Sequence, residues 1–350
     1  MQHTQTPEKY MSRALELARH GLGATRTNPM VGCVIAAADG RIIGESWHRR
    51  YGEGHAEVNA VASVRPDDQH LLSEATAYVT LEPCSHYGKT PPCAKLLINK
   101  HIPHVVVASV DPFPAVSGRG IRMLRDAGVA VETGLLAREA EQLNAVFMTA
   151  HRRQRPFITL KWAQSADAFM DHRRTADRPT AARFSTPLTS AMAHRLRALH
   201  GAILVGSGTV IADNPGLDTR LFPGESPVPV ILDRRGRLQG TDYKVLTNSN
   251  TLILSDYCSL TEAMHGLYER GFTSVLVEGG AQTLRAFIDE GLWDAARVET
   301  APFSLGADGI AKAPSLSTLR PVHTATVGEN VISWFTNNDL FTATHPFIEG

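Results

Sequence analysis

Apolar residues along the chain follow two spacings in turn, and this alternation predicts strands followed by helices. In the first half, short apolar runs predict strands at residues 31–37, 77–81 and 105–110, and apolar residues at helical spacing predict helices at 8–20, 57–64, 93–100 and 120–127. The turn dipeptide Asp39-Gly40, followed by Ile42 and Ile43, predicts that the first strand enters a hairpin. Strands alternating with helices are typical of α/β layer folds.

The second half shows the same alternation with a different sequence. It predicts strands at 157–162, 202–205, 228–232, 251–254, 274–277 and 297–301, and helices at 189–199, 260–270 and 281–290. Between the halves lies the charged segment 152–156, whose proline disfavours helix at the preceding residue. Because 350 residues suit two domains and we find no internal repeat, we predict two different α/β domains, residues 1–150 and 151–350.

Composition and charge exclude several classes of function. Hydrophobic residues make up 43% and charged residues 20%, as is ordinary for a globular protein. The 35 basic and 35 acidic residues balance, which argues against a nucleic-acid binder but allows a local basic pocket for a phosphate. No apolar run approaches the roughly 18–20 residues that span a bilayer, and the polar N-terminus lacks the apolar core of a signal peptide. We therefore expect a cytoplasmic protein without membrane or nucleic-acid partners.

The four cysteines are Cys33, Cys84, Cys93 and Cys258. In a reducing compartment such residues are metal ligands, nucleophiles or core residues more often than disulfide partners. Cys33 stands inside an apolar run and Cys258 has no partner motif, so we predict that both are core residues.

The remaining two cysteines combine with a histidine and a glutamate to indicate a metal site. His55 precedes Glu57 by two residues, and Cys84 and Cys93 follow further along the chain. One imidazole and two thiolates suit tetrahedral zinc and leave its fourth position to water, whose pKa zinc lowers to about 7. Glu57, at the start of a predicted helix, can lie over the metal without binding it and shuttle a proton to a ring nitrogen and a leaving amine.

The spacing is similar to that of zinc-dependent nucleobase deaminases, which carry His-x-Glu followed by Pro-Cys-x-x-Cys. Here eight residues, 85–92, separate the two thiols, and their Gly and Pro content suits a loop. His86 is a competing ligand, which we rank below Cys93 because a fourth protein ligand would close the site to water. A structural zinc site, or two buried cysteines with an unrelated histidine, remains the alternative.

Two strand–glycine–helix junctions mark the second half, at residues 203–209 and 275–280. No Gly-x-Gly-x-x-Gly opens this domain, so a Rossmann dinucleotide site is not supported. Glycine permits close approach of the backbone and a helix N-terminus favours an anion, so a pyrophosphate at Gly279–Gly280 is the functional interpretation. The alternative is that these glycines only turn the chain.

Longer motifs carry a more specific resemblance. The segments His-Ala-Glu-Val at 55–58, Tyr-Val-Thr-Leu-Glu-Pro-Cys at 78–84 and Gly-Lys-Thr-Pro-Pro-Cys at 88–93 closely resemble the bifunctional riboflavin biosynthesis deaminase/reductase family. The wide spacing of the two cysteines is specific to that family among zinc deaminases. Residues 28–32 and 111–114 also look like its substrate-side loops, and the resemblance covers nearly the whole chain.

This resemblance implies a fold and two activities. It implies a cytidine-deaminase-like α/β/α domain followed by a dihydrofolate-reductase-like α/β domain. The first domain would deaminate 2,5-diamino-6-(5-phosphoribosylamino)pyrimidin-4(3H)-one with Zn²⁺. The second would use NADPH to reduce the ribosyl group of the product to ribityl. A small-molecule substrate and a homo-oligomer, a dimer or larger, are further expectations.

The resemblance also assigns residues to both sites. The zinc ligands are His55, Cys84 and Cys93, with Glu57 as the proton donor. The residues expected to face NADPH are Ala163, Thr209, Asp213 and Gly280, and those expected to face the substrate are Arg197, Leu217, Arg220 and Glu278. Arginines suit a phosphate through bidentate hydrogen bonds, although an isolated arginine is more often a surface charge. Lys161 also matches a family position; otherwise it would be a lysine at the sheet edge.

The chain departs from the family in three places. Ala168 stands where glycine is usual, Arg183 where an aromatic residue often lies over the cofactor, and Arg234-Arg235 where a loop often carries serine. The two arginines would pair with the 2′-phosphate of NADPH. The departures leave open a weakened reductase, or a zinc deaminase of another base or nucleoside with a degenerate or unrelated second domain. A non-enzymatic, zinc-stabilised binding module is the third hypothesis, and it would have no need of Glu57.

Overall fold

The computed structural model describes residues 6–86, 91–113, 117–238 and 242–348. The chain divides into two compact units, Met1–Arg152 and Arg153–Gly350. Across the described ranges, no helix has both the length and the apolar character needed to cross a membrane.

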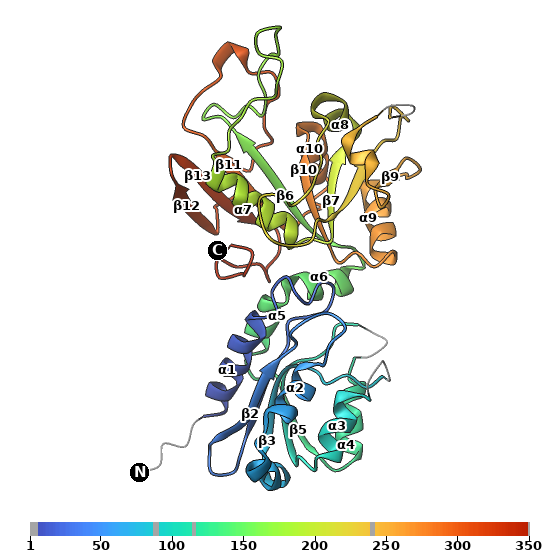
Figure 1. Cartoon of the computed structure of the whole chain (residues 1–350), viewed down its shortest axis with the longest axis vertical. Coiled ribbons are helices and arrows are strands. Elements are labelled where there is room, and N and C mark those ends of the chain that lie inside the picture. The colour runs from blue at the N-terminus through green and yellow to red at the C-terminus, as the bar shows by residue number, and fades with distance from the viewer. Residues whose placement is uncertain (1–5, 87–90, 114–116, 239–241, 349–350) are drawn as a thin grey trace. The chain divides into compact units, whose positions relative to one another are not determined.

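The first unit contains a five-stranded sheet in the order β2-β1-β3-β4-β5 (Figure 1). Strand β1 pairs antiparallel with β2 and β3, and β3, β4 and β5 run parallel. The β1–β2 pair confirms the predicted hairpin. The strands are β1 (Gly32–Ala36), β2 (Ile42–Trp47), β3 (Thr76–Leu81), β4 (His104–Ser109) and β5 (Ala130–Thr133).

Helices cover both faces of this sheet, because alternate strand residues face opposite apolar clusters. One cluster includes Cys33, which is fully buried, and packs against α2, α3 and α4. The opposite cluster packs against α1 and α5. The helices are α1 (Pro7–Arg19), α2 (Ala56–Ser63), α3 (Cys93–Asn99), α4 (Arg119–Asp126), α5 (Ala137–Leu143) and α6 (Ala145–Arg153), and the 3-10 helix η1 (Pro66–Glu74) precedes β3.

The second unit is built on an eight-stranded sheet in the order β12-β13-β11-β6-β10-β7-β8-β9 (Figure 1). Six neighbouring strands of this sheet run parallel: β11, β6, β10, β7, β8 and β9. Strand β13 pairs antiparallel with β11 and β12. The strands are β6 (Phe157–Gln164), β7 (Ala202–Gly206), β8 (Val228–Leu232), β9 (Leu252–Leu254), β10 (Ser274–Gly279), β11 (Ala295–Thr300), β12 (His323–Val327) and β13 (Asn330–Thr336).

The two faces of this sheet differ in polarity. The helices α9 (Leu260–Glu269) and α10 (Ala281–Asp289) contribute to the apolar core on one face. The other face carries Thr159, Lys161 and Glu278 and is contacted from α7 (Pro187–Ala198) and the residues after it. Lys161 is therefore not at a sheet edge, because β6 lies between β10 and β11. The shorter helices are α8 (Ser207–Asp213), η2 (Lys244–Thr247) and η3 (Gly306–Asp308).

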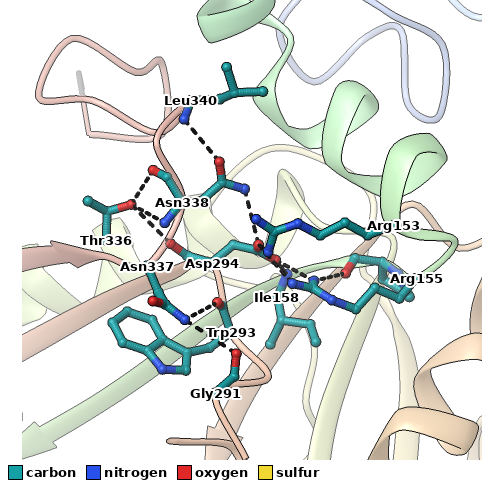
Figure 2. Close-up of polar contacts among 11 residues, drawn as sticks. Arg153, Arg155, Ile158, Gly291, Trp293, Asp294, Thr336, Asn337, Asn338 and Leu340 are labelled. Carbon is teal, nitrogen blue, oxygen red and sulfur yellow. Dashed lines mark hydrogen bonds and ion pairs between the residues drawn. The ribbon is translucent and has the colours of Figure 1, made fainter. Parts of the chain in front are cut away.

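A buried carboxylate joins the start of β6 to the start of β11. Asp294 is fully buried, and Arg155 donates to both of its oxygens at 2.6 and 3.0 Å (Figure 2). The backbone N–H of Ile158 donates at 2.8 Å, the side-chain amide of Asn338 at 3.1 Å, and Arg153 at 3.3 Å. Because a buried charge is costly unless it is paired and hydrogen-bonded, this network keeps the two strand ends and the chain after β13 together.

The prediction that Cys258 is a core residue is wrong. Its side chain is exposed, in the turn that leads into α9. The backbone N–H of Cys258 donates to the Glu262 carboxylate at 2.7 Å, and Ser259 caps the helix. Cys258 therefore belongs to the capped start of α9 and not to the apolar core.

Candidate active sites

Three side chains from separate elements of the first unit come together. His55 directly precedes α2, Cys84 follows β3, and Cys93 is the first residue of α3. Their possible metal-binding atoms lie within 4.8 Å of one another. Among the described residues, these three form the group of histidine, cysteine and acidic side chains that could hold a metal ion. Part of the loop between the two cysteines, residues 87–90, lies outside the described ranges.

The distances within this group fit zinc. The Nδ1 atom of His55 lies 3.5 Å from Sγ of Cys84 and 3.4 Å from Sγ of Cys93. A tetrahedral zinc ion with ordinary Zn–N and Zn–S bond lengths places such atoms about 3.5 Å apart. His86 is exposed and does not belong to the group. The geometry therefore fits a metal with three protein ligands.

Hydrogen bonds favour the anionic form of one ligand. Bonds from the Cys93 thiol and from His55 lower the pKa of Cys84 well below its usual value. The backbone N–H of Cys93 also donates to the Cys84 sulfur at 3.3 Å. Because the thiolate is the form that binds metals, these contacts prepare Cys84 as a ligand.

Glu57 lies beside the three ligands without being one of them. It is in the first turn of α2 and only 3% exposed. Burial raises the pKa of its carboxyl to about 7, and the negative charge of Cys84 adds to the effect. A carboxyl with a pKa near 7 can take up and release a proton at neutral pH, as a general acid–base residue must.

Sequence reasoning missed His48, which contacts the candidate metal centre. Its ring meets the His55 ring edge-on, with centroids 5.3 Å apart. Nδ1 lies 3.1 Å from the carbonyl oxygen of Gly54, and Nε2 lies 3.2 Å from Nδ2 of Asn28. The carbonyl can only accept, so we assign the proton to Nδ1, which leaves Nε2 to accept from Asn28. An isolated histidine with no motif around it gives no signal in the sequence.

In the second unit, the two predicted strand–glycine–helix junctions lie next to each other, because β7 and β10 are paired strands. A Cβ atom at Gly206 would lie 2.7 Å from Oγ1 of Thr283, and one at Gly280 would lie 3.2 Å from Oγ1 of Thr209. The structure thus brings the predicted residues Thr209 and Gly280 together. Glycine, which has no Cβ atom, permits this close approach of the two junctions.

The second junction can also receive an anion. Gly280 is the N-cap of α10, and within the described chain no side chain caps the first N–H groups of this helix. Gly279 has φ +134°, a backbone conformation that favours glycine. Free N–H groups at a helix start suit a phosphate, so the cradle formed by the two junctions fits the pyrophosphate of a dinucleotide.

The predicted substrate residues are grouped around an ion pair. Arg197 donates to both carboxylate oxygens of Glu278, at 2.9 and 2.7 Å, and to the carbonyl oxygen of Asp218 at 2.8 Å. Burial opposes the ionisation of Glu278, but the charges of Arg197 and Lys161 outweigh it and lower the pKa of Glu278 to about 2. Glu278 is therefore a buried anion at neutral pH.

The other predicted residues differ in their surroundings. Leu217 is buried next to Asp218, while Arg220 is exposed and paired with the Asp218 carboxylate. Asp213 is paired with Arg174, so its carboxylate already has a cation. Predicted cofactor residue Ala163 lies near the end of β6, opposite Glu299 of β11.

The positions that depart from the family are at the surface or in unusual backbone conformations. Ala168 adopts φ +62°, a conformation that favours glycine, and Arg183 is exposed. Arg234 and Arg235 are exposed after β8, with the Arg234 guanidinium 5.4 Å from the centre of the Tyr257 ring.

Arg237, which sequence reasoning did not select, lies in the same turn as Arg234 and Arg235. It donates to the hydroxyl of Ser207, the first residue of α8, at 2.8 Å. The turn after β8 therefore carries positive charge to the start of α8.

Comparison with known proteins places both units in one family. Residues 4–109 match the cytidine and deoxycytidylate deaminase zinc-binding region, and residues 156–333 match the RibD C-terminal domain. The riboflavin biosynthesis protein RibD of Bacillus amyloliquefaciens is 39% identical over 88% of this chain and 87% of its own length.

Solved structures agree over the whole length. Acinetobacter baumannii RibD is 33% identical with a TM-score of 0.82, and a diaminohydroxyphosphoribosylaminopyrimidine deaminase/5-amino-6-(5-phosphoribosylamino)uracil reductase from Thermotoga maritima is 34% identical with a TM-score of 0.80. Each comparison covers 94% of this chain and 98% of the other. The chain therefore belongs to the RibD family, the bifunctional zinc deaminases and pyrimidine reductases of riboflavin biosynthesis, which act on small-molecule substrates.

Proposed function

We propose that residues 1–150 catalyse the hydrolytic deamination of 2,5-diamino-6-(5-phosphoribosylamino)pyrimidin-4(3H)-one, and that residues 151–350 reduce the ribosyl group of the product with NADPH. The observation that carries the proposal is the group formed by His55, Cys84 and Cys93 beside the buried Glu57. The named activity of the Thermotoga maritima relative supports the choice of substrate.

The deaminase site divides the work between ligands and a proton carrier. His55, Cys84 and Cys93 would hold the zinc ion, which would supply the Lewis acidity that makes water nucleophilic near neutral pH. The Glu57 carboxylate would accept one proton from the attacking water and deliver it to the ring nitrogen. It would then carry the second proton of that water to the leaving amine, which departs as ammonia. Burial of Glu57 keeps its pKa high enough for both steps.

In the reductase unit, the cradle around Gly206 and Gly280 would hold the pyrophosphate of NADPH, with Thr209, Asp213 and Ala163 facing the cofactor. NADPH would supply the hydride. Arg234 and Arg235 would pair with its 2′-phosphate, since they are exposed in the turn that follows β8, the strand next to β7.

The substrate lies against the Arg197–Glu278 pair. Ionised Glu278 accepts hydrogen bonds from hydroxyl groups of the ribosyl chain, and Arg197 fixes the direction of its carboxylate. Arg220 is exposed and can exchange Asp218 for the substrate phosphate, because an arginine binds a phosphate with two parallel hydrogen bonds. Leu217 packs below this segment as an apolar contact.

A homo-oligomer, a dimer or larger, and a cytoplasmic location complete the proposal. Both are expectations from the family resemblance. Sedimentation of the purified chain tests the first: a single species of about 38 kDa, the mass of one chain, would contradict it.

One experiment separates the proposal from its main alternative. The diamino-pyrimidine ribotide is supplied with NADPH, and ammonia release and NADPH oxidation are followed separately. We expect ammonia first and NADPH oxidation after it. Ammonia without oxidation would support the alternative of a deaminase joined to a degenerate second domain.

A further inference from the structure

The carboxylate of Glu82 accepts hydrogen bonds from four backbone N–H groups. Oε1 accepts from Gly120 at 2.8 Å and from Ile121 at 3.3 Å. Oε2 accepts from Gly118 at 2.9 Å and from Asp111 at 3.2 Å. The residue is only 7% exposed, so one side chain satisfies the first turn of α4 and the segment after β4 together.

Glu82 is also tied to the metal centre through the chain. It stands two residues before Cys84, and its own N–H donates to the carbonyl oxygen of Ser109 at 2.9 Å, which prolongs the pairing of β3 and β4. The start of α4 also packs against the peptide between Pro83 and Cys84. A Cβ atom at Gly120 would lie 1.9 Å from the carbonyl oxygen of Pro83. The peptide that leads into Cys84 is therefore packed against α4.

The segment that Glu82 holds on its other side is tied to the chain that leads into the metal centre. Asp111 donates its backbone N–H to the Glu82 carboxylate at 3.2 Å, and Glu82 stands two residues before Cys84. Asp111 accepts from the N–H of Phe113 at 2.8 Å, which gives residues 111–113 a defined turn. Glu82 therefore holds this turn and the peptide before Cys84 together.

We propose that Glu82 is a positioning residue for deamination. It fixes the turn at 111–113 and the start of α4 relative to Cys84, so that the substrate meets a preformed wall beside the metal centre. Charge-assisted hydrogen bonds to backbone N–H groups are short and strong, and four of them on one carboxylate resist movement of the turn. The inference rests on the proposed deaminase function. It assigns to Glu82 an effect on substrate binding and not on proton transfer.

The substitution Glu82→Gln tests this role, because it keeps the shape and points amide hydrogens at N–H donors. We expect the KM of the deaminase substrate to rise about tenfold or more, with kcat changed less. We also expect one zinc per chain and unchanged NADPH oxidation with the deaminated substrate. The conservative variant Glu82→Asp keeps the charge on a shorter side chain. Its KM should lie between that of the wild-type chain and that of Glu82→Gln. Glu45→Gln, which removes the charge of a carboxylate paired with Arg13 in the same unit, is the matched control.

A second variant disturbs the packing of α4 against the Pro83 peptide by a change in α4 itself. Gly120→Ala forces α4 away from the Pro83 carbonyl and should raise KM in the same way, even where Glu82→Gln fails to fold. An unchanged KM with full zinc in either folded variant overturns the inference. So does a loss of zinc and of kcat in equal proportion at unchanged KM, which would mean that Glu82 only stabilises the fold. Absence of ammonia release from the wild-type chain would overturn the proposed deaminase itself, before any variant is compared.

Discussion

The Nδ1 atom of His55 lies 3.4 Å from the Sγ atom of Cys93, although the two residues are 38 positions apart in the chain. The β-α connections of the first unit create this proximity, because one residue precedes α2 and the other begins α3. Cys84, at the end of β3, completes the group. The site is therefore a product of where strands end and helices begin.

Removal of one sulfur ligand should separate the two activities. We expect Cys84→Ser to lose most of its zinc and to lower ammonia release at least about 100-fold, because two ligands hold the metal far more weakly than three. NADPH oxidation with the deaminated substrate should be retained. Metal analysis and the two assays check this, with Cys258→Ser, a change at an exposed cysteine, as the control. Full zinc in the Cys84 variant would refute the ligand assignment.

A side chain at the cofactor cradle should affect the reductase alone. We expect Gly280→Val to raise the KM for NADPH about tenfold or more, since its Cβ would lie 3.2 Å from Oγ1 of Thr209 and its methyl groups would fill the cradle. Ammonia release should not change. Gly266→Ala, in α9 with open space around it, is the matched control and should leave both activities intact. An unaltered KM for NADPH in the Gly280 variant would mean that the cofactor binds elsewhere.

The arginines after β8 should set the preference for NADPH over NADH. We expect the double variant Arg234→Ala/Arg235→Ala to raise the KM for NADPH about tenfold or more and to leave that for NADH unchanged, because NADH lacks the 2′-phosphate. Steady-state kinetics with both cofactors measure the ratio. If the preference persists, these arginines are ordinary surface charges.

The stability of the second unit should depend on pH through Glu278. Its pKa in the folded chain is about 2, against 4.5 for the free side chain, so the ionised form stabilises the fold fully above about pH 5. This contribution is lost as pH falls from about 4.5 towards 2, and at pH 3 the loss is about 2 kcal/mol. The free energy of unfolding, measured with urea, should decline between pH 6 and pH 3 in the wild-type chain. In Glu278→Gln this decline should be smaller by about this amount. An equal decline would show that Glu278 ionises at its ordinary pKa.

The sequence alone identified those features whose signal is local. The His-x-Glu pair and the two cysteines could be recognised because motif and chemistry coincide there, and Gly280 could be recognised because a strand precedes it and a helix follows. His48 escaped because it stands outside any motif and its partners include a side chain from a remote segment. Glu82 lies inside the recognised motif at 78–84, but its role escaped because its partners are backbone N–H groups of a remote segment.

An error arose where the neighbours of an element decide the outcome, because the exposure of Cys258 depends on the turn around it. The alternative interpretation of Lys161 as a lysine at the sheet edge fails for a similar reason, because apolar periodicity does not encode strand order. Some elements were not predicted at all. The four residues of β5 are mostly exposed and lack an apolar run, and α8 is short and contains a glycine. The other elements not predicted were α5, α6, β12, β13 and the 3-10 helices η1, η2 and η3.

The substitution Glu57→Gln tests the central claim most directly, because it removes the proton carrier and leaves His55, Cys84 and Cys93 in place. Ammonia release from the diamino-pyrimidine ribotide is measured together with zinc content and NADPH oxidation. We expect one zinc per chain, unchanged oxidation with the deaminated substrate, and ammonia release lowered by about 10²–10⁴-fold. Ammonia release at the wild-type rate in the zinc-loaded variant would contradict the claim.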